Sequence, residues 1–111
     1  MAELKDIEID QFYSFIDSNP DCVVYFWGPH CGLCRYTSPI FENVVKEYDG
    51  VSFAKLNVTE NTGTYSMLGI KGVPTIKFYK DGMTVNTIVG CKDMTKVKDE
   101  YKQAISDLIN G

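Results

Sequence analysis

The sequence has no long hydrophobic run and no excess of basic residues. No apolar stretch approaches the roughly 18 residues that a membrane-spanning helix needs. Acidic residues outnumber basic ones by 15 to 11, and the net charge of −4 argues against binding to nucleic acids or anionic membranes. The first residues, Met1 to Asp6, lack the charged and then apolar layout of a signal peptide. We therefore expect a cytoplasmic protein.

The sequence has four cysteines, Cys22, Cys31, Cys34 and Cys91, and only Cys31 and Cys34 are close in sequence. In a reducing cytoplasm a close cysteine pair is more often catalytic or metal-binding than structural. A closed zinc site needs four ligands, and the other candidates, Cys22, Cys91 and His30, form no second close pair. The sequence favours redox chemistry, with no metal and no cofactor besides a disulfide between Cys31 and Cys34.

The residue pattern predicts alternating helices and strands. The 111 residues, 44% of them hydrophobic, are enough for one domain with a buried core. Expected strands cover residues 22–27, 51–58, 75–79 and 84–89, with a hairpin at Asp81-Gly82. Expected helices cover 10–18, the residues from the cysteine pair to 48, 64–68, and a C-terminal helix after an Asp93 N-cap. This order predicts an α/β domain whose mixed sheet has helices on both faces.

The segment Cys31-Gly32-Leu33-Cys34 follows a buried strand and opens a helix. Three residues apart at a helix start, the two sulfurs can reach bonding distance. Cys31 lies at the positive end of the helix dipole, which favours the thiolate, and the thiolate is the nucleophile. Cys34 lies one turn further in and should be more shielded. This asymmetry predicts that Cys31 attacks and that Cys34 resolves.

Several motifs in the right order resemble the thioredoxin family, from about residue 4 to 110. They are the active-site stretch Phe26-Trp27-Gly28-Pro29-His30-Cys31-Gly32-Leu33-Cys34-Arg35, the helix proline Pro39, the third-strand segment Lys55 to Val58, the cis-proline segment Gly72-Val73-Pro74-Thr75, the hairpin Lys80-Asp81-Gly82 and the groove glycine in Val89-Gly90. The resemblance implies one thioredoxin domain over residues 1–111. Its five-stranded mixed sheet would have the order 1-3-2-4-5, four flanking helices, and its last two strands antiparallel to the rest.

The resemblance also implies a protein-disulfide reductase that acts on disulfide-containing proteins and is regenerated by a separate thioredoxin reductase. We expect a monomer. The implied substrate-binding residues are His30, Gly32, Leu33, Val73, Gly90 and Cys91, and the implied supporting residues are Tyr25, Trp27, Lys55 and Pro74. Two alternatives stay open: a disulfide oxidase or isomerase on the same fold, and a non-catalytic thioredoxin-like binding module.

Three residues depart from the family pattern. Tyr25 stands where the family has a buried aspartate, and a buried phenol cannot act as a base at neutral pH. Leu33 replaces a proline between the cysteines, a position that tunes the redox potential, and His30 replaces a tryptophan. His30 either becomes charged near about pH 6.5 and favours the thiolate, or lies exposed at the rim. Without the aspartate as a partner, Lys55 is expected to extend to the surface, and Cys91 to lie near the site without a catalytic role.

Overall fold

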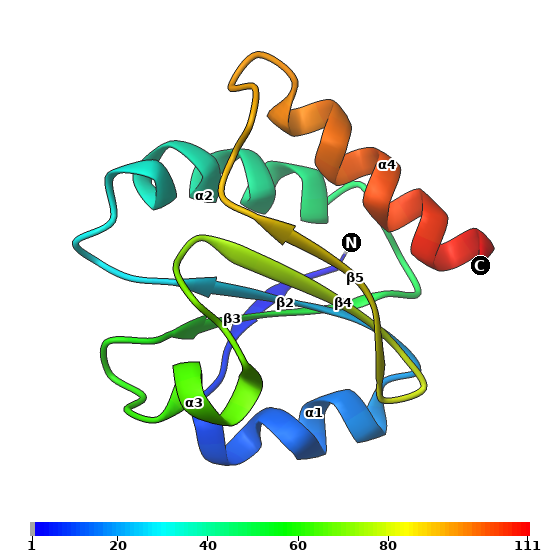
Figure 1. Ribbon diagram of the computed structural model, residues 1–111. Helices are drawn as coiled ribbons and strands as arrows, with labels where there is room; N and C mark the ends of the chain where they lie inside the picture. The colour runs from blue at the N-terminus through cyan, green and yellow to red at the C-terminus, as the bar shows by residue number, and fades with distance from the viewer. Residues whose placement is uncertain (1) are drawn as a thin grey trace.

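The computed structural model describes residues 2–111 and has a five-stranded sheet between two layers of helices (Figure 1). The strands are β1 (Leu4–Asp6), β2 (Asp21–Trp27), β3 (Ser52–Asn57), β4 (Thr75–Lys80) and β5 (Met83–Val89). The helices are α1 (Phe12–Ser18), which follows the 3-10 turn η1 (Ile9–Gln11), α2 (Gly32–Val45), α3 (Thr64–Leu68) and α4 (Val97–Asn110). Helices α2 and α4 cover one face of the sheet, and α1 and α3 the other. Within residues 2–111, no helix combines the length and apolar character needed to cross a membrane.

The strands lie in the order β1-β3-β2-β4-β5, which confirms the expected order. Strands β1, β3 and β2 are parallel, and β4 is antiparallel to β2. Because β5 is antiparallel to β4, it runs in the same direction as β2. The expectation that both last strands oppose the rest is therefore wrong. The physical reason is the tight turn at Asp81 and Gly82, whose φ angles of 52° and 82° suit a two-residue hairpin that makes its two strands antiparallel.

Apolar side chains fill both faces of the sheet. The central strand β2 is covered on both sides, and its residues 22–26 are all buried. On the α2 and α4 side, Phe41 stacks on Tyr25 and makes edge contacts with Phe53 and Tyr101. These contacts hold α2 against the sheet and against α4. The packing of α2 therefore also fixes the position of the residues at its start.

Helix α1 begins at Phe12 and not at residue 10, because residues 9–11 form the 3-10 turn η1, and two further helix ends also differ from the expected ones. Helix α4 begins at Val97 because the Asp93 carboxylate accepts hydrogen bonds from the backbone N–H and hydroxyl of Thr95, at 2.9 and 2.6 Å, and forms a turn of its own. Asp93 is thus not the helix N-cap. Helix α2 ends at Val45, before the expected Tyr48, because the backbone N–H of Tyr48 bonds to the Val45 carbonyl three residues earlier and tightens the chain into a turn.

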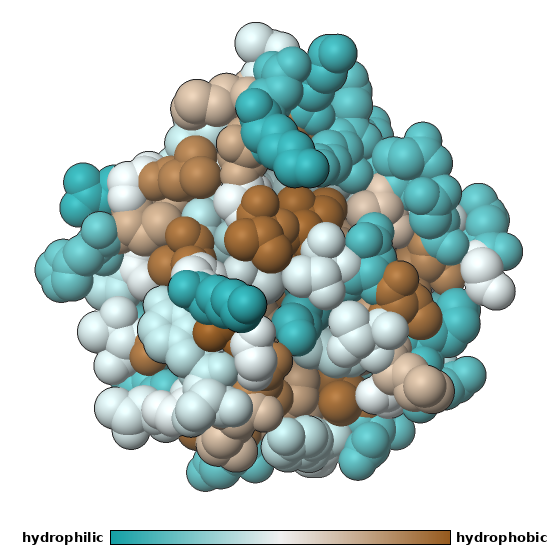
Figure 2. Space-filling view, viewed as in Figure 1, coloured by the Kyte–Doolittle hydropathy of each residue, from teal (hydrophilic) through white to brown (hydrophobic). Residues whose placement is uncertain are grey.

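Strand β5 forms an open edge of the sheet, and the face shown in Figure 2 carries apolar side chains among polar ones. Met83, Val85 and Val89 of β5 are each more than half exposed. The pairing of β4 and β5 shifts between Phe78 and Tyr79, because Phe78 lies opposite Asn86 and Tyr79 opposite Thr84. Val85 is therefore an extra residue in β5, and it forms a β-bulge.

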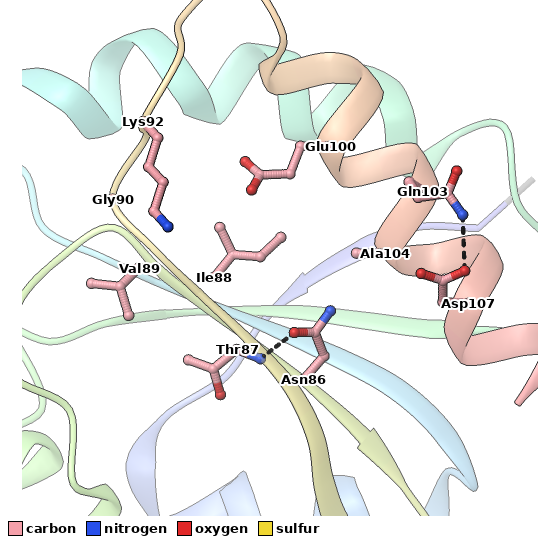
Figure 3. Close-up of a pocket in the computed structure, with 10 residues that line it drawn as sticks. All are labelled: Asn86, Thr87, Ile88, Val89, Gly90, Lys92, Glu100, Gln103, Ala104 and Asp107. Atoms are coloured by element: carbon pink, nitrogen blue, oxygen red, sulfur yellow. Dashed lines mark hydrogen bonds between the residues drawn. The ribbon is translucent and has the colours of Figure 1, made fainter.

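An open hollow of about 490 Å³ lies between β5 and α4 (Figure 3). Hydrogen bonds already engage part of its polar lining, since Asn86 Oδ1 accepts from the Thr87 N–H at 2.8 Å and Gln103 donates to Asp107 at 2.8 Å. Gly90 lies at its border, but neither of the paired cysteines lines it. The hollow is separate from the position of the disulfide.

Candidate active site

A disulfide joins Cys31 and Cys34 at the start of α2, with their Cα atoms 5.2 Å apart. Strand β2 ends at Trp27, and the following loop brings Cys31 to the N-cap position of the helix. The Cys34 backbone N–H donates a hydrogen bond to Cys31 Sγ at 3.1 Å. Cys34 is only 2% exposed, whereas Cys31 is half-buried. The two sulfurs thus differ in accessibility, as the spacing predicted.

The Val73-Pro74 segment faces the disulfide. Its peptide bond is cis, as the family resemblance implied. The Val73 carbonyl oxygen lies 3.6 Å from Cys31 Sγ. The Gly90 N–H donates to the Pro74 carbonyl at 2.8 Å, and a Cβ atom at Gly90 would lie 4.0 Å from the Leu33 side chain. The structure thus brings Val73, Pro74, Gly90 and Leu33 together at the disulfide.

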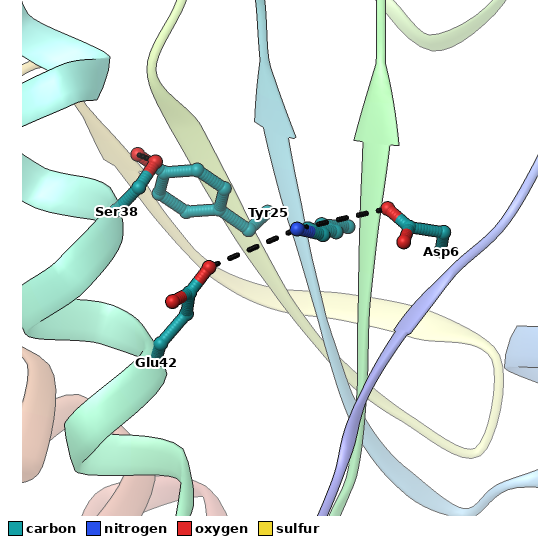
Figure 4. Close-up of polar contacts among 5 residues, drawn as sticks. Asp6, Tyr25, Ser38 and Glu42 are labelled. Atoms are coloured by element: carbon teal, nitrogen blue, oxygen red, sulfur yellow. Dashed lines mark hydrogen bonds and ion pairs between the residues drawn. The ribbon is translucent and has the colours of Figure 1, made fainter.

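Tyr25 lies beneath the first turns of α2, with 1% of its surface exposed. Its hydroxyl oxygen is 2.6 Å from Thr37 Oγ1. It is also 3.1 Å from Ser38 Oγ (Figure 4). Within residues 2–111 it makes no hydrogen bond to either cysteine of the disulfide. Burial raises the pKa of Tyr25, and the hydrogen bonds with Ser38 and Thr37 only partly offset this. The phenol therefore stays protonated at neutral pH.

Thr37 and Ser38 are site residues that the sequence did not single out. Thr37 is fully buried, and its hydroxyl donates to the Leu33 carbonyl at 3.1 Å. The only signal in the sequence is weak: two hydroxyl residues stand next to Pro39 in an otherwise apolar helix stripe. Hydroxyl residues commonly bond to their own helix backbone, so their partner on β2 was not evident.

Lys55 does not simply extend into solvent, as its missing aspartate partner suggested. Its ammonium group lies 3.8 Å from an Asp6 carboxylate oxygen and 3.7 Å from one of Glu42 (Figure 4). It also lies 5.7 Å from the centre of the Trp27 ring, and its side chain is 27% exposed. Each exposed ion pair of this kind contributes at most about 1 kcal/mol. Their combined effect is to hold Lys55 between β1, α2 and the half-buried Trp27.

The remaining predicted residues lie at different depths. His30 and Gly32 are exposed, and the His30 ring has no hydrogen bond or ion pair within the described part of the chain. Exposure at the rim is one of the two alternatives for His30, and its effect on the thiolate stays a prediction.

Cys91 is half-buried and free, and it packs against the core on the α2 side. Cys22 is buried, and burial, with a smaller effect of Asp21, raises its pKa to about 12, so its thiol is inert at neutral pH.

Changing Cys91 to alanine is expected to leave the reduction of an insulin-type disulfide within about twofold of the unchanged protein. The reason is that Cys31 forms its disulfide with Cys34, and Cys91 is bonded to neither cysteine. Initial rates at equal folded concentration measure the effect, with Cys34→Ala as the comparison that removes the partner. A loss of about tenfold or more would show that Cys91 takes part in resolution.

Among residues 2–111, no group of three or more histidine, cysteine, aspartate or glutamate side chains is placed to hold a metal ion. The sulfurs of Cys31 and Cys34 are bonded to each other. The chemistry that this arrangement can perform is thiol–disulfide exchange, in which the bond between two sulfurs is broken and formed.

Comparison with known proteins gives consistent matches. The sequence model of the family "Thioredoxin" matches residues 3–103. Thioredoxin 1 of Nostoc sp. is 35% identical over 103 residues, which cover 92% of this chain and 94% of that protein. The thioredoxin of Synechocystis sp. is 38% identical over 81 residues, which cover 72% of this chain and 76% of that protein.

Solved structures agree with these matches. The thioredoxin of Plasmodium falciparum has a TM-score of 0.82 and 30% identity, over 94% of this chain and 98% of that one. The thioredoxin of Malassezia sympodialis has a TM-score of 0.83 and 28% identity, over 96% of this chain and 91% of that one. With the paired sulfurs beside a cis-proline segment, these matches show that the chain belongs to the thioredoxin family of thiol–disulfide oxidoreductases.

Proposed function

We propose that this protein reduces disulfide bonds of other proteins, with Cys31 as the attacking group and Cys34 as the resolving group. The observation that carries the proposal is the unequal accessibility of the two sulfurs, with Cys31 half-buried and Cys34 2% exposed. A substrate disulfide can reach the first sulfur, and only the neighbouring Cys31 can reach the second.

In the first step the Cys31 thiolate attacks one sulfur of the substrate disulfide. The substrate's S–S bond breaks, one substrate thiolate leaves, and a mixed disulfide forms. In the second step Cys34 attacks Cys31 Sγ, the mixed disulfide breaks, and the second substrate thiol is released. The protein is left with the Cys31–Cys34 bond, and two electrons have passed to the substrate.

The position of Cys31 supports the thiolate. As the N-cap of α2 it lies at the positive end of a 14-residue helix, and the Cys34 N–H points at its sulfur from 3.1 Å. Both effects stabilise negative charge on sulfur and lower a thiol pKa. The exposed His30, next in sequence, is a further candidate for the same effect when it is protonated.

The surroundings of Cys31 support the docking of a substrate segment. The Val73 carbonyl lies 3.6 Å from the sulfur and offers a backbone acceptor, and Gly90 has no side chain that would block the approach. Exposed Gly32 and half-buried Leu33 and Cys91 complete the proposed contact surface. Buried Pro74 and half-buried Trp27 are the proposed supporting residues of this surface.

The oxidised protein needs an external electron source, and we propose a thioredoxin reductase, the partner that family membership implies. We also propose that the protein acts as a monomeric single domain in the cytoplasm. Two further thiols, Cys22 and Cys91, are free, and free thiols suit a reducing compartment.

Equilibration of the Cys31–Cys34 pair with a series of glutathione redox buffers tests this function. We expect a reducing potential near about −270 mV, the range of disulfide reductases. A potential near about −120 mV, where strong disulfide oxidants lie, would instead support an oxidase. Leu33 between the cysteines makes this measurement decisive, since it replaces the proline of the family pattern.

A further inference from the structure

A chain of hydroxyl groups leads from the sheet-facing side of α2 to the peptide between the two cysteines. Thr37 has one hydroxyl proton, which it donates to the Leu33 carbonyl at 3.1 Å. Thr37 must then accept the 2.6 Å hydrogen bond from the Tyr25 hydroxyl. Since the Tyr25 proton is used in that bond, Tyr25 accepts from Ser38 at 3.1 Å. The donors therefore run in one direction, from Ser38 to Tyr25 to Thr37 to the Leu33 carbonyl.

The end of this chain is the peptide group that links Leu33 to Cys34. Its carbonyl oxygen accepts from Thr37, and its N–H donates to Cys31 Sγ at 3.1 Å. Hydrogen bonds in series polarise one another, and each bond accepted by a carbonyl makes the N–H of the same peptide a better donor. The low polarity of the surroundings strengthens the effect, because Thr37 and Tyr25 are almost completely buried.

We propose that Tyr25, Thr37 and Ser38 are positioning residues that act through the Leu33–Cys34 peptide to strengthen its hydrogen bond to the Cys31 sulfur. They thereby stabilise Cys31 as a thiolate without touching the substrate. This inference rests on the proposed function, in which the Cys31 thiolate attacks. Because burial raises the pKa of Tyr25, the three hydroxyl groups keep their protons across the pH range in which thiols titrate.

The titratable and charged groups on the segments around Cys31 belong to several elements. They are His30, Cys34 and Arg35 on its own loop and helix, Glu60 and Lys71 on the loops after β3 and before β4, and Cys91 and Lys92 after β5. Variants of the hydroxyl chain alter none of these groups. A shift in the titration of Cys31 in such variants therefore reports the hydroxyl chain.

The test is the pH profile of Cys31 alkylation by iodoacetamide in the fully reduced protein, with the labelled cysteine identified by mass spectrometry. In Tyr25→Phe and in Thr37→Val, the profile should move to higher pH, so that alkylation below the midpoint slows by about twofold. The double variant should shift no further than Thr37→Val alone, because the two groups act in series. Circular dichroism tests whether each variant is folded. Ser38→Ala replaces a variant that does not fold, and it should shift the profile in the same direction.

The matched control is Tyr79→Phe, which removes the hydroxyl of another buried tyrosine, on β4 and in the core on the opposite face of the sheet. Its alkylation profile should not move. Unchanged profiles in the hydroxyl-chain variants, or an equal shift in Tyr79→Phe, would overturn the inference while leaving the proposed function intact. Alkylation of Cys34 ahead of Cys31 in the unchanged protein would overturn the proposed function itself.

Discussion

Changing Cys34 to serine is expected to make the protein accumulate mixed disulfides with its substrates. Cys31→Ser should form no mixed disulfides. In Cys34→Ser the first attack still occurs, but no thiol is placed to break the bond to Cys31. In Cys31→Ser the accessible nucleophile is lost, and the rate should fall by on the order of 1,000-fold or more, the effect of removing a covalent nucleophile. Non-reducing gel electrophoresis with a peptide disulfide measures trapping, and turnover measures the loss.

Cys91→Ser is the matched control for this pair, because it makes the same substitution at another half-buried cysteine, one that is not part of the disulfide. It should not trap substrate, and its turnover should stay within about twofold of that of the unchanged protein. Accumulation of mixed disulfides by Cys31→Ser, and not by Cys34→Ser, would reverse the roles assigned to the two sulfurs.

Tyr25→Asp is expected to cause the largest loss of stability. The change empties the space of a ring that is 1% exposed and stacked on Phe41 at 5.0 Å. Large-to-small changes in a core cost about 2–5 kcal/mol. The new carboxylate also has to be buried, which raises its pKa above the value of about 3.9 that it has in the unfolded chain.

The pH dependence of this loss follows from the raised pKa. Below about pH 4 the aspartate is protonated in both states, and the charge adds no penalty. Above that pH the unfolded chain releases the proton first, so the free energy of unfolding falls by about 1.4 kcal/mol per pH unit until the folded-state pKa is reached. The variant should therefore lose stability between about pH 4 and neutral pH.

Urea unfolding of Tyr25→Asp and Tyr25→Phe across this pH range measures the effect. Tyr25→Phe is the matched control, because it keeps the ring and adds no titrating group. At low temperature, the fraction of Tyr25→Asp that remains folded should resolve mixed disulfides faster per molecule, since a buried carboxylate near neutrality is a base that the phenol is not. A Tyr25→Asp protein that gains stability relative to Tyr25→Phe as the pH rises would contradict this account.

The sequence was sufficient to predict the position of the disulfide, and the family resemblance was sufficient to predict the cis-proline segment beside it. Cys31 and Cys34 are three residues apart at a helix start, so their geometry is local, and the same is true of the hairpin at Asp81-Gly82. The role of Asp93 was mispredicted. Its carboxylate could either cap the helix or form a turn with Thr95, and it forms the turn.

The partners of Tyr25 and Lys55 could not be predicted in this way. Whether the Tyr25 hydroxyl meets Thr37 depends on how α2 is rotated and shifted over β2, which the packing of both elements decides. Lys55 of β3 meets Glu42 only because α2 covers this face of the sheet (Figure 1). Contacts between elements distant in sequence are set by the tertiary structure, and no local pattern encodes them.

The bulge at Val85 has a consequence for how the molecule behaves in a crowded solution. Strand β5 is long and solvent-facing, and it exposes Met83 and Val89, so its free backbone groups would invite a strand from another chain to extend the sheet. The extra residue breaks the regular spacing of those groups midway along the strand. An incoming strand whose hydrogen bonds are in register with the backbone of Thr87 is out of register with that of Thr84. The edge can therefore guide only short pairings, which protects the protein from self-assembly into longer sheets.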